Sequence, residues 1–249
     1  MTDWLDWPFF EPAHRDLAAR LKQWCNERDL HHGTNVDEEC RSLVCELGAA
    51  SLLELCTEGD VRSLAIARST LAYHSGLADF AFAMQGLGSG AIRLFGSDEQ
   101  KSAWLPRVAS GEAIAAFALT QPESGRGGAN IPMAARADGD GWVLDGEKSY
   151  ISNGTIADVL TVFGRTGEGQ GSKGISAFIV RGDDPGLAVA DRIEVVAPHP
   201  LARLRFERAR AELIGEPGAG FRTAMETLNL FRVTVGAAAL GFARRARDE

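Results

Sequence analysis

No run of apolar residues in this sequence approaches the roughly 18 positions that a membrane-spanning helix requires. The first residues, Met1-Thr2-Asp3-Trp4-Leu5-Asp6, are acidic and do not resemble a signal peptide. Basic residues are not in excess either, because 26 Lys and Arg stand against 34 Asp and Glu, a formal net charge of −8. That balance disfavours non-specific binding to nucleic acids or anionic membranes. We therefore expect neither a membrane span nor a nucleic-acid partner.

Cysteine is also scarce, and none of the four residues belongs to a Cys-x-x-Cys pair. Cys25, Cys40, Cys45 and Cys56 all lie in the first quarter of the chain, within a helical pattern that indicates buried thiols. His31-His32 lies nearby, but the spacing matches no standard set of metal ligands. We expect no metal site and a reduced, cytoplasmic protein.

The first 112 residues have the apolar spacing of a helical bundle. Asp37 is expected to cap the second helix, and Ser97 has the sequence context of a helix start. Met84 and the phenylalanines beside it are better interpreted as core than as a cofactor site. The predicted helices run from about Leu17 to Leu30, from Asp37 to Gly48, over 61–95 with a break near Ser75-Gly76, and onward from Ser97.

From Ile114 to about Ile214 the apolar period changes to two, which favours an antiparallel barrel or sandwich. Asp145-Gly146 predicts a two-residue hairpin turn, and Asn153-Gly154 predicts a second turn. The candidate strands are 114–120, 132–138, 141–145, 148–152, 159–164, 174–181, 186–190, 193–197, 201–206 and 210–214.

Beyond Glu216-Pro217-Gly218-Ala219-Gly220 the helical pattern returns. This last helix is apolar on so much of its surface that we expect partners on several sides. The basic cluster Arg244-Arg245-Ala246-Arg247 near its end is more simply a solvated face than a nucleic-acid site. We expect an α+β protein with a helical domain over 1–112, a β-domain over 113–215 and the first helix of a second helical domain over 216–249.

Two stretches carry the functional signal. The first, Phe117 to Gly128, predicts a buried strand that runs into a loop with a hydroxyl, a proline and clustered glycines. Such a loop lets backbone amides approach an anion, although an ordinary strand with a flexible loop has the same pattern. The second stretch, Gly141 to Gly154, contains Gly146-Glu147-Lys148-Ser149-Tyr150-Ile151-Ser152-Asn153-Gly154.

Together these stretches resemble the two β-domain motifs of the acyl-CoA dehydrogenase family, Thr-Glu-Pro-x-Ala/Ser-Gly-Ser-Asp and Gly-x-Lys-x-Trp/Tyr-Ile-Ser/Thr-Asn-Gly. The resemblance covers essentially the whole chain, since the family also has the order α-domain, β-domain, α-domain. It does not cover the family's remaining C-terminal portion, which this sequence lacks. Enzymes of this family remove the α-proton of an acyl thioester with a glutamate while the β-hydride passes to flavin N5.

The resemblance implies FAD as the cofactor and places its ring against the two motifs. Thr120 and Ser152 match hydroxyl positions beside the flavin, where a donor stabilises the reduced ring. Tyr150 matches an aromatic that shields the flavin from water. The residues expected at the cofactor are Phe117, Ala118, Leu119, Thr120, Gly125, Arg126, Tyr150, Ile151 and Ser152.

Asn229 and Arg232 match a family Asp/Asn-x-x-Arg pattern along the acyl-CoA channel. A guanidinium there suits carbonyl and phosphate oxygens, although Arg232 could instead pair with Glu226 or with a residue of another subunit. Arg126 is also expected on the substrate side, where its charge could serve a pyrophosphate.

Three positions depart from the family pattern. Arg126 stands where the family has serine, and Gln121 stands where it has glutamate. A minority of members place the catalytic base on the helix that begins the second α-domain, at the position of Phe231, which cannot abstract a proton. Glu226 lies over one helical turn away. We therefore assign no catalytic residue.

The resemblance leaves three functions open. The first is dehydrogenation of an acyl-CoA to the trans-2-enoyl-CoA, with electron-transfer flavoprotein as the electron acceptor. The second is a catalytically inactive family member that serves as a structural partner of a homologue. The third is a flavin-dependent monooxygenase of the same fold, which needs no glutamate base. We expect a homo-oligomer, or a hetero-oligomer with a family homologue, that covers the last helix.

Overall fold

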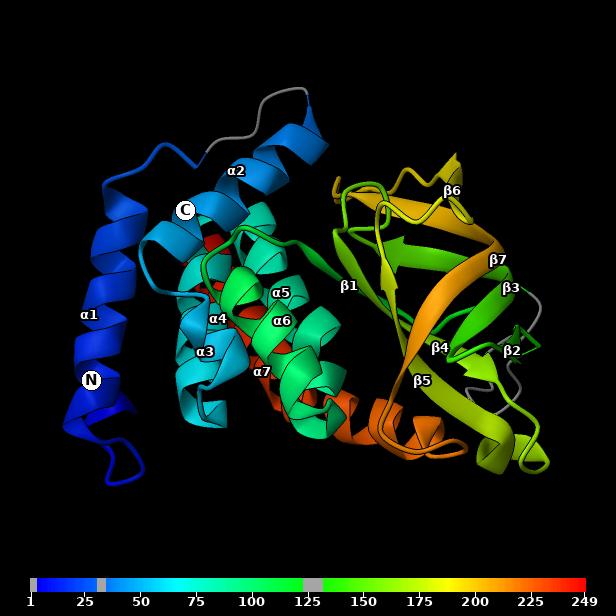
Figure 1. Ribbon diagram of the computed structural model, residues 1–249. Helices are drawn as coiled ribbons and strands as arrows, with labels where there is room; N and C mark the ends of the chain where they lie inside the picture. Colours follow the sequence, from blue (N-terminus) through cyan, green and yellow to red (C-terminus); the bar gives the residue numbers. More distant parts are fainter. Residues whose placement is uncertain (1–3, 31–34, 123–131) are drawn as a thin grey trace.

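The computed structural model describes residues 4–30, 35–122 and 132–249. Figure 1 shows a helical part beside a β-sheet part, with the last helix running from the sheet behind the other helices. The helices are α1 (Pro12–Asn26), α2 (Val36–Ala49), α3 (Glu54–Thr57), α4 (Val61–His74), α5 (Gly76–Phe95), α6 (Asp98–Ala109) and α7 (Gly220–Asp248), with short 3-10 helices at Trp4–Asp6 and Gly171–Gly174.

Local capping places several helix starts where the sequence predicts them. The expected break between α4 and α5 is confirmed: the Ser75 hydroxyl accepts a hydrogen bond from the Ala78 N–H at 3.2 Å. The predicted start of α6 is also confirmed, because Ser97 and Gln100 form a reciprocal capping box.

The predicted cap of α2 is wrong. The Asn35 side chain is the cap and accepts from the Glu38 N–H, so α2 begins at Val36, one residue before Asp37. Asp37 instead pairs with Arg192, 155 residues later in the sequence. Asn and Asp cap helices equally well, so local sequence does not decide between them.

Strand pairing closes most of the sheet into a barrel. Strands β4, β2, β3, β7 and β5 follow one another, and β5 pairs back onto β4. The strands are β1 (Ala115–Ala118), β2 (Ala134–Asp138), β3 (Gly141–Ser152), β4 (Val159–Arg165), β5 (Ile175–Arg181), β6 (Leu187–Arg192) and β7 (Leu201–Ile214). Of the predicted alternatives, barrel or sandwich, the structure forms the barrel, and its pairs are antiparallel except that β1 and β2 run parallel to β4. A long connection separates β1 from β4, which permits parallel pairing.

Two features of the predicted strands are wrong. The tight turn between β2 and β3 lies at Gly139-Asp140, and Asp145-Gly146 lies inside β3 at a bulge against β7. An Asp-Gly pair suits a hairpin turn and an irregular strand position alike, because glycine adopts positive φ values that other residues rarely take. Gly146 has a φ of 140°. Similarly, 201–206 and 210–214 form one continuous β7, and 193–197 is not a strand. The predicted turn at Asn153-Gly154 is confirmed.

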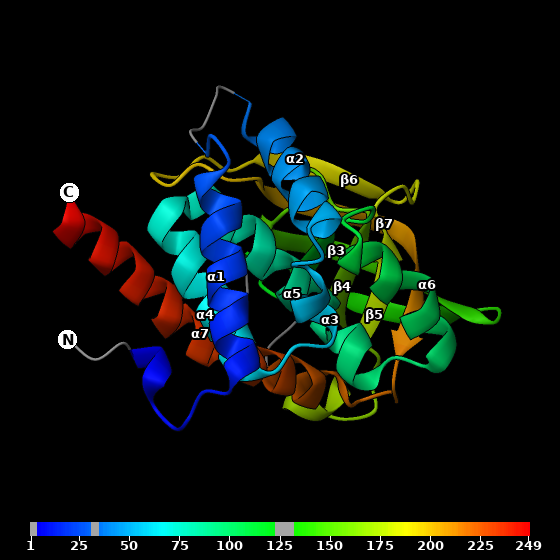
Figure 2. The same cartoon turned by 90° about the vertical axis from the view of Figure 1, so that its left-hand side faces the viewer.

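Helix α5 joins the helical part to the barrel. The buried Gln85 side chain accepts from the Ala115 N–H and donates to the Ala113 carbonyl, both at 2.8 Å. The Thr161 hydroxyl of β4 donates to the Gly88 carbonyl at 2.7 Å. On its other side α5 packs against α4 and α7, and Figure 2 shows the end of α7 extending past the other helices. The first β-strand is therefore held by a buried helix.

The four cysteines divide into two groups. Cys25, Cys40 and Cys56 are buried as predicted, and burial raises the pKa of each thiol to about 12. The prediction is wrong for Cys45, which is exposed. Its place in α2, next to the buried Val44, puts it on the outer side of the helix.

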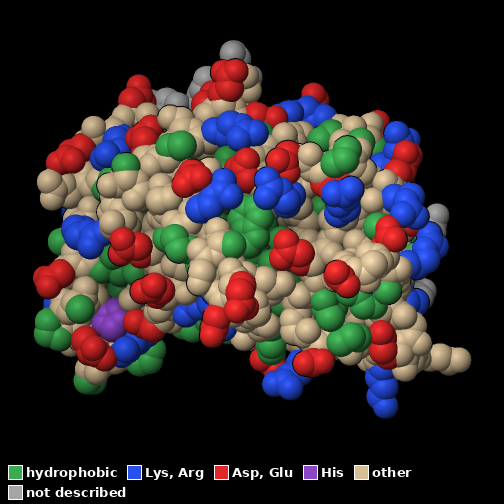
Figure 3. Space-filling model, viewed as in Figure 1, with side chains coloured by type: hydrophobic (Ala, Val, Ile, Leu, Met, Phe, Trp, Pro, Cys, Tyr) green, Lys and Arg blue, Asp and Glu red, His purple; other side chains and the backbone are tan. Residues whose placement is uncertain are grey.

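Charges on the surface are mixed in sign. Figure 3 shows Lys and Arg side chains interspersed with Asp and Glu over the face viewed in Figure 1. In the basic cluster at the end of α7, Arg245 pairs with Glu249 and Arg247 pairs with Asp248, while Arg244 donates to the Ser69 hydroxyl of α4. No helix within the described ranges is long and apolar enough to cross a membrane.

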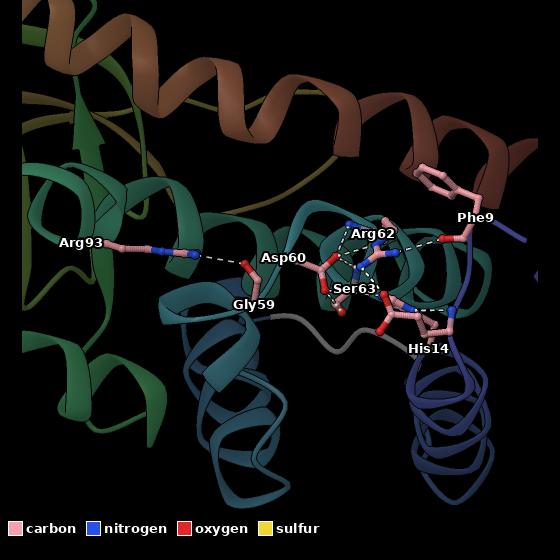
Figure 4. Close-up of polar contacts among 8 residues, drawn as sticks. Phe9, His14, Gly59, Asp60, Arg62, Ser63 and Arg93 are labelled. Atoms are coloured by element: carbon pink, nitrogen blue, oxygen red, sulfur yellow. Dashed lines mark hydrogen bonds and ion pairs between the residues drawn. The ribbon is translucent and has the colours of Figure 1, made fainter.

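Asp60 ties the start of α4 to α1 (Figure 4). Its carboxylate accepts from the backbone N–H groups of Arg62 and Ser63, and it lies 3.4 Å from the buried His14 ring. Burial by itself raises the pKa of Asp60, but hydrogen bonds from Ser63 and Arg62 and the nearby His14 outweigh it, so the pKa falls from 3.8 to about 2.

The lowered pKa of Asp60 predicts a pH-dependent stability difference. A depressed folded-state pKa contributes stability that is present above pH 3.8 and is lost as the pH falls towards 2. Asp60→Asn keeps a capping side chain but removes the charge. Urea unfolding should find this variant less stable than the wild type at neutral pH, with the gap narrowing below pH 4. A gap that is constant with pH would contradict the assigned network.

Candidate functional site

The first motif follows β1 to the edge of the barrel. Phe117 is half-buried with its ring 5.0 Å from that of Phe163, and Ala118 is fully buried. Leu119 is half-buried and Thr120 is exposed, so the chain emerges from the core at the hydroxyl. Gly125 and Arg126 lie outside the described residues, so their predicted cofactor and substrate contacts stay predictions.

The second motif presents an aromatic ring to solvent from an irregular part of β3. Tyr150 has a φ of +56° and its side chain is 64% exposed, while Ile151 is buried and Ser152 is half-buried. A bulge between Lys148 and Ile151 interrupts the pairing with β7 at this point. A bulge changes the direction in which the side chains of a strand point. Residues with a strained backbone are often found at binding sites. The geometry therefore directs Tyr150 outward.

The structure brings the two motifs together through three consecutive residues of β3. The Ser149 N–H donates to the Thr120 carbonyl at 3.0 Å, and the Gln121 side chain donates to the Glu147 carbonyl at 3.1 Å. Between them, Lys148 Nζ donates to the Leu119 carbonyl at 3.0 Å. Thr120 and Tyr150 are thus held on adjacent segments.

Sequence reasoning did not assign a role to Lys148. The side chain is completely buried, and burial lowers its pKa well below the ordinary value. A lysine within a strand normally indicates a solvent-facing position, so nothing in the local pattern predicts this burial. Its position in the second motif is the only sequence signal that could have drawn attention to it.

On α7, the predicted substrate residues lie on the exposed side. Asn229 and Arg232 are both exposed, and an Arg232 nitrogen donates to Asn229 Oδ1 at 2.7 Å. Glu226, the alternative partner for Arg232, pairs instead with Arg222 at 2.7 Å. The two substrate candidates therefore form one polar pair on the helix surface.

Phe231 points the other way, into the helical core. It is 6% exposed, and its ring lies against α5, where a Cβ added to Gly86 would come within 2.5 Å of it. The neighbouring thiol of Cys56 also borders this space. Phe231 is a packing residue and offers no proton acceptor.

A cavity of about 430 Å³ lies between the helices and the loop before β7, and the sequence did not reveal it. Its walls come from α4, α5, α7 and the loop before β7, with the rings of Phe80 and His199 only 4.5 Å apart. That loop continues into Pro200, whose carbonyl accepts from the Asn153 N–H at 2.8 Å. Apolar side chains dominate the walls: Leu77, Phe80, Ala83, Met84, Ala197, Pro198 and Phe242.

A buried ion pair forms the polar part of this cavity. Arg68 of α4 donates two hydrogen bonds to Asp79 of α5, at 2.8 and 2.7 Å, and a third to Thr234 of α7 at 3.3 Å. The Arg68 and Asp79 side chains are only 13% and 5% exposed. Three helices thus meet at one guanidinium, and the cavity has a size and composition usual for small-molecule sites.

Comparison with known proteins identifies two family models along the chain. Residues 11–112 match the acyl-CoA dehydrogenase N-terminal domain, and residues 116–209 match the acyl-CoA dehydrogenase middle domain. Over 268 residues the chain is 32% identical to a probable acyl-CoA dehydrogenase of Mycobacterium leprae, covering 100% of this chain and 69% of that protein.

Two further similar proteins are also acyl-CoA dehydrogenases. The mitochondrial short-chain specific acyl-CoA dehydrogenase of Homo sapiens is 40% identical over 164 residues, covering 64% of this chain and 40% of its own length. An acyl-CoA dehydrogenase from Bacillus anthracis, solved in complex with FAD, superposes with a TM-score of 0.86 at 30% identity. That superposition covers 95% of this chain and 44% of the Bacillus chain.

Proposed function

The chain belongs to the acyl-CoA dehydrogenase family of FAD-dependent flavoproteins, and we propose that it acts in the dehydrogenation of an acyl-CoA to the trans-2-enoyl-CoA. The observation that carries this proposal is the junction of the two motifs, where the Ser149 N–H holds Thr120 beside Tyr150. FAD would supply the acceptor for the β-hydride of the substrate.

The described residues fit such a cofactor. Tyr150 offers an aromatic face that is 64% exposed, and the bulge in β3 holds it there against the usual backbone preference. Thr120 and Ser152 add hydroxyls on the adjoining segments. The buried Ala118 anchors the segment of Thr120 to the barrel, and the buried Ile151 anchors that of Ser152. A planar heteroaromatic ring needs this combination of one stacking surface and several edge donors.

Each side chain has a distinct proposed task. The Thr120 and Ser152 hydroxyls would donate to the polar edge of the ring and stabilise its electron-rich reduced form. Tyr150 would cover the ring and exclude water. Phe117, Ala118 and Leu119 would position the backbone that follows the cofactor.

The acyl-CoA would lie along α7 and end in the cavity. Arg232, oriented by Asn229, would donate to the oxygens of the CoA portion. The apolar cavity would take the acyl tail, since the loop that lines it continues into Pro200, which is bonded to Asn153 of the second motif. Arg126 remains a further proposed contact for phosphate oxygens.

One observation favours the second function, a catalytically inactive partner of a homologue. Phe231 occupies the position where some family members carry the base, and it is buried against α5. In that case the chain would bind flavin and acyl-CoA without removing the α-proton. Its proposed partner would be a related chain in a hetero-oligomer.

The electron acceptor and the compartment also belong to the proposal. We propose electron-transfer flavoprotein as the acceptor, consistent with the chemistry of the family. A cytoplasmic location is supported by four free thiols, which suit a reducing compartment.

A visible absorption spectrum tests these functions. The purified protein is saturated with FAD, freed of excess cofactor, and mixed anaerobically with a set of acyl-CoA thioesters. We expect loss of the flavin band and formation of enoyl-CoA. A retained band would contradict dehydrogenation by this chain and favour the inactive partner, and failure to retain FAD would contradict both.

A further inference from the structure

Lys148 is the least expected residue in the site. It is the only lysine among the fully buried side chains of the described residues, and the Leu119 carbonyl is its hydrogen-bond partner at 3.0 Å. Taking an ammonium group out of water carries a large desolvation penalty unless an opposite charge compensates it. Burial is the effect that shifts the pKa of Lys148 downwards, which favours the neutral amine.

The two motifs are already joined by hydrogen bonds that bury no ammonium group. On either side of Lys148, Ser149 and Glu147 already bond to Thr120 and Gln121 through backbone atoms. An apolar side chain of similar length at position 148 would fill the same space without the desolvation penalty. Stability of the barrel therefore does not explain the amine.

The hydrogen bond from the Lys148 amine to the Leu119 carbonyl explains the presence of the amine better than barrel stability does. The Leu119 carbonyl belongs to the peptide unit whose nitrogen is that of Thr120. A donor on this carbonyl fixes the plane of the peptide and polarises its N–H. It therefore restrains the backbone that carries the Thr120 hydroxyl, at the point where the chain leaves the core.

We propose that Lys148 is a positioning residue that holds the Leu119–Thr120 peptide so that Thr120 meets the flavin ring. The inference rests on the proposed flavin site. It assigns to Lys148 no contact with the cofactor or substrate. The residue acts through Thr120, and its effect is on cofactor affinity more than on folding.

Lys148→Met tests the proposal, because methionine is unbranched like lysine, only one atom shorter, and carries no donor. We expect FAD to bind about tenfold more weakly, measured by titrating flavin-free protein with FAD and following flavin fluorescence. The flavin-free variant should unfold at the same temperature as the wild type or higher. Lys22→Met, the same change at an exposed lysine of α1, should alter neither quantity.

A double-mutant cycle with Thr120→Val identifies the route of the effect. If Lys148 acts through Thr120, the double variant should bind FAD about as weakly as Thr120→Val alone. Losses that multiply would overturn the positioning role. So would a flavin-free Lys148→Met protein that is markedly destabilised, since that marks a structural lysine.

The outcomes separate this inference from the function on which it rests. Unchanged FAD affinity in Lys148→Met, with normal binding by the wild type, overturns the role of Lys148 and leaves the proposed function standing. A wild type that does not bind FAD overturns both.

Discussion

Gly88→Ala is expected to lower the free energy of unfolding by about 3 kcal/mol, the upper part of the usual range for overpacking a core. A Cβ added at Gly88 would lie 2.6 Å from the backbone nitrogen of Ala116 and 2.7 Å from the backbone carbon of Ala115. These atoms belong to β1, which pairs with β4 and cannot move alone. Helix α5 would have to shift away from the barrel.

That shift would also strain the polar contacts across the same interface. The Gly88 carbonyl accepts from the Thr161 hydroxyl, and Gln85 one turn earlier bonds to both Ala113 and Ala115. Because β1 leads directly to Thr120, we expect the variant to bind FAD more weakly as well. Denaturant unfolding followed by circular dichroism would measure the stability change.

Gly236→Ala is the matched control for this substitution. Gly236 is an exposed position in the interior of α7, and a Cβ added there would meet nothing within 4 Å. Alanine has the higher helix propensity, so this variant should gain up to about 1 kcal/mol. Equal effects at the two glycines would show that α5 does not contact β1 as closely as described.

Arg68→Met is expected to destabilise the protein by about 3–5 kcal/mol, as removal of one partner from a buried ion pair does. The variant leaves the Asp79 carboxylate, 5% exposed, without the guanidinium that donates to both of its oxygens. It also removes the donor to Thr234, so α7 loses one of its polar contacts with α4. The loss would be measured by denaturant unfolding at neutral pH.

Two further variants test this interpretation. Arg68→Met combined with Asp79→Leu removes both charges and should recover much of the lost stability. Arg222→Met breaks an ion pair with Glu226 on the exposed surface of α7 and should change stability by less than about 1 kcal/mol. A double variant as unstable as Arg68→Met alone would refute the assignment of the loss to an unpaired carboxylate.

The same ion pair connects stability with the cavity. Arg68 and Asp79 line the space proposed for the acyl tail, next to Phe80 and Met84. Met84 was predicted to be a core residue because its sequence neighbours are apolar. In the structure it is half-buried and lines the cavity. Because the pair draws α4, α5 and α7 together, the walls of the cavity depend on it.

Much of this architecture was predictable from short-range sequence. The Ser97 and Gln100 capping box spans only four positions, so the start of α6 depends on adjacent residues. The alternating pattern after residue 114 likewise indicated a barrel or sandwich, since a strand exposes side chains with a period of two, and the strand pairing makes it a barrel. The two motifs pointed to the family on their residue order alone, and the family models confirm it.

Where a short pattern suits two geometries, the sequence left the choice open. Asp145-Gly146 fits a hairpin turn and a position opposite a bulge equally, and only the pairing of Gly146 with Phe206 of β7 places it inside β3. Asn35 and Asp37 can both cap α2, and Asp37 is removed from that role by Arg192 from a distant strand.

The sequence by itself determined the family, the order of helical and β parts, and the segments that meet at the proposed flavin site. Only the tertiary structure decided the burial of Lys148, the inward packing of Phe231 and the pairing of Arg68 with Asp79. These features depend on contacts between residues far apart in the chain. Burial and charge pairing are properties of such contacts, and local periodicity does not encode them.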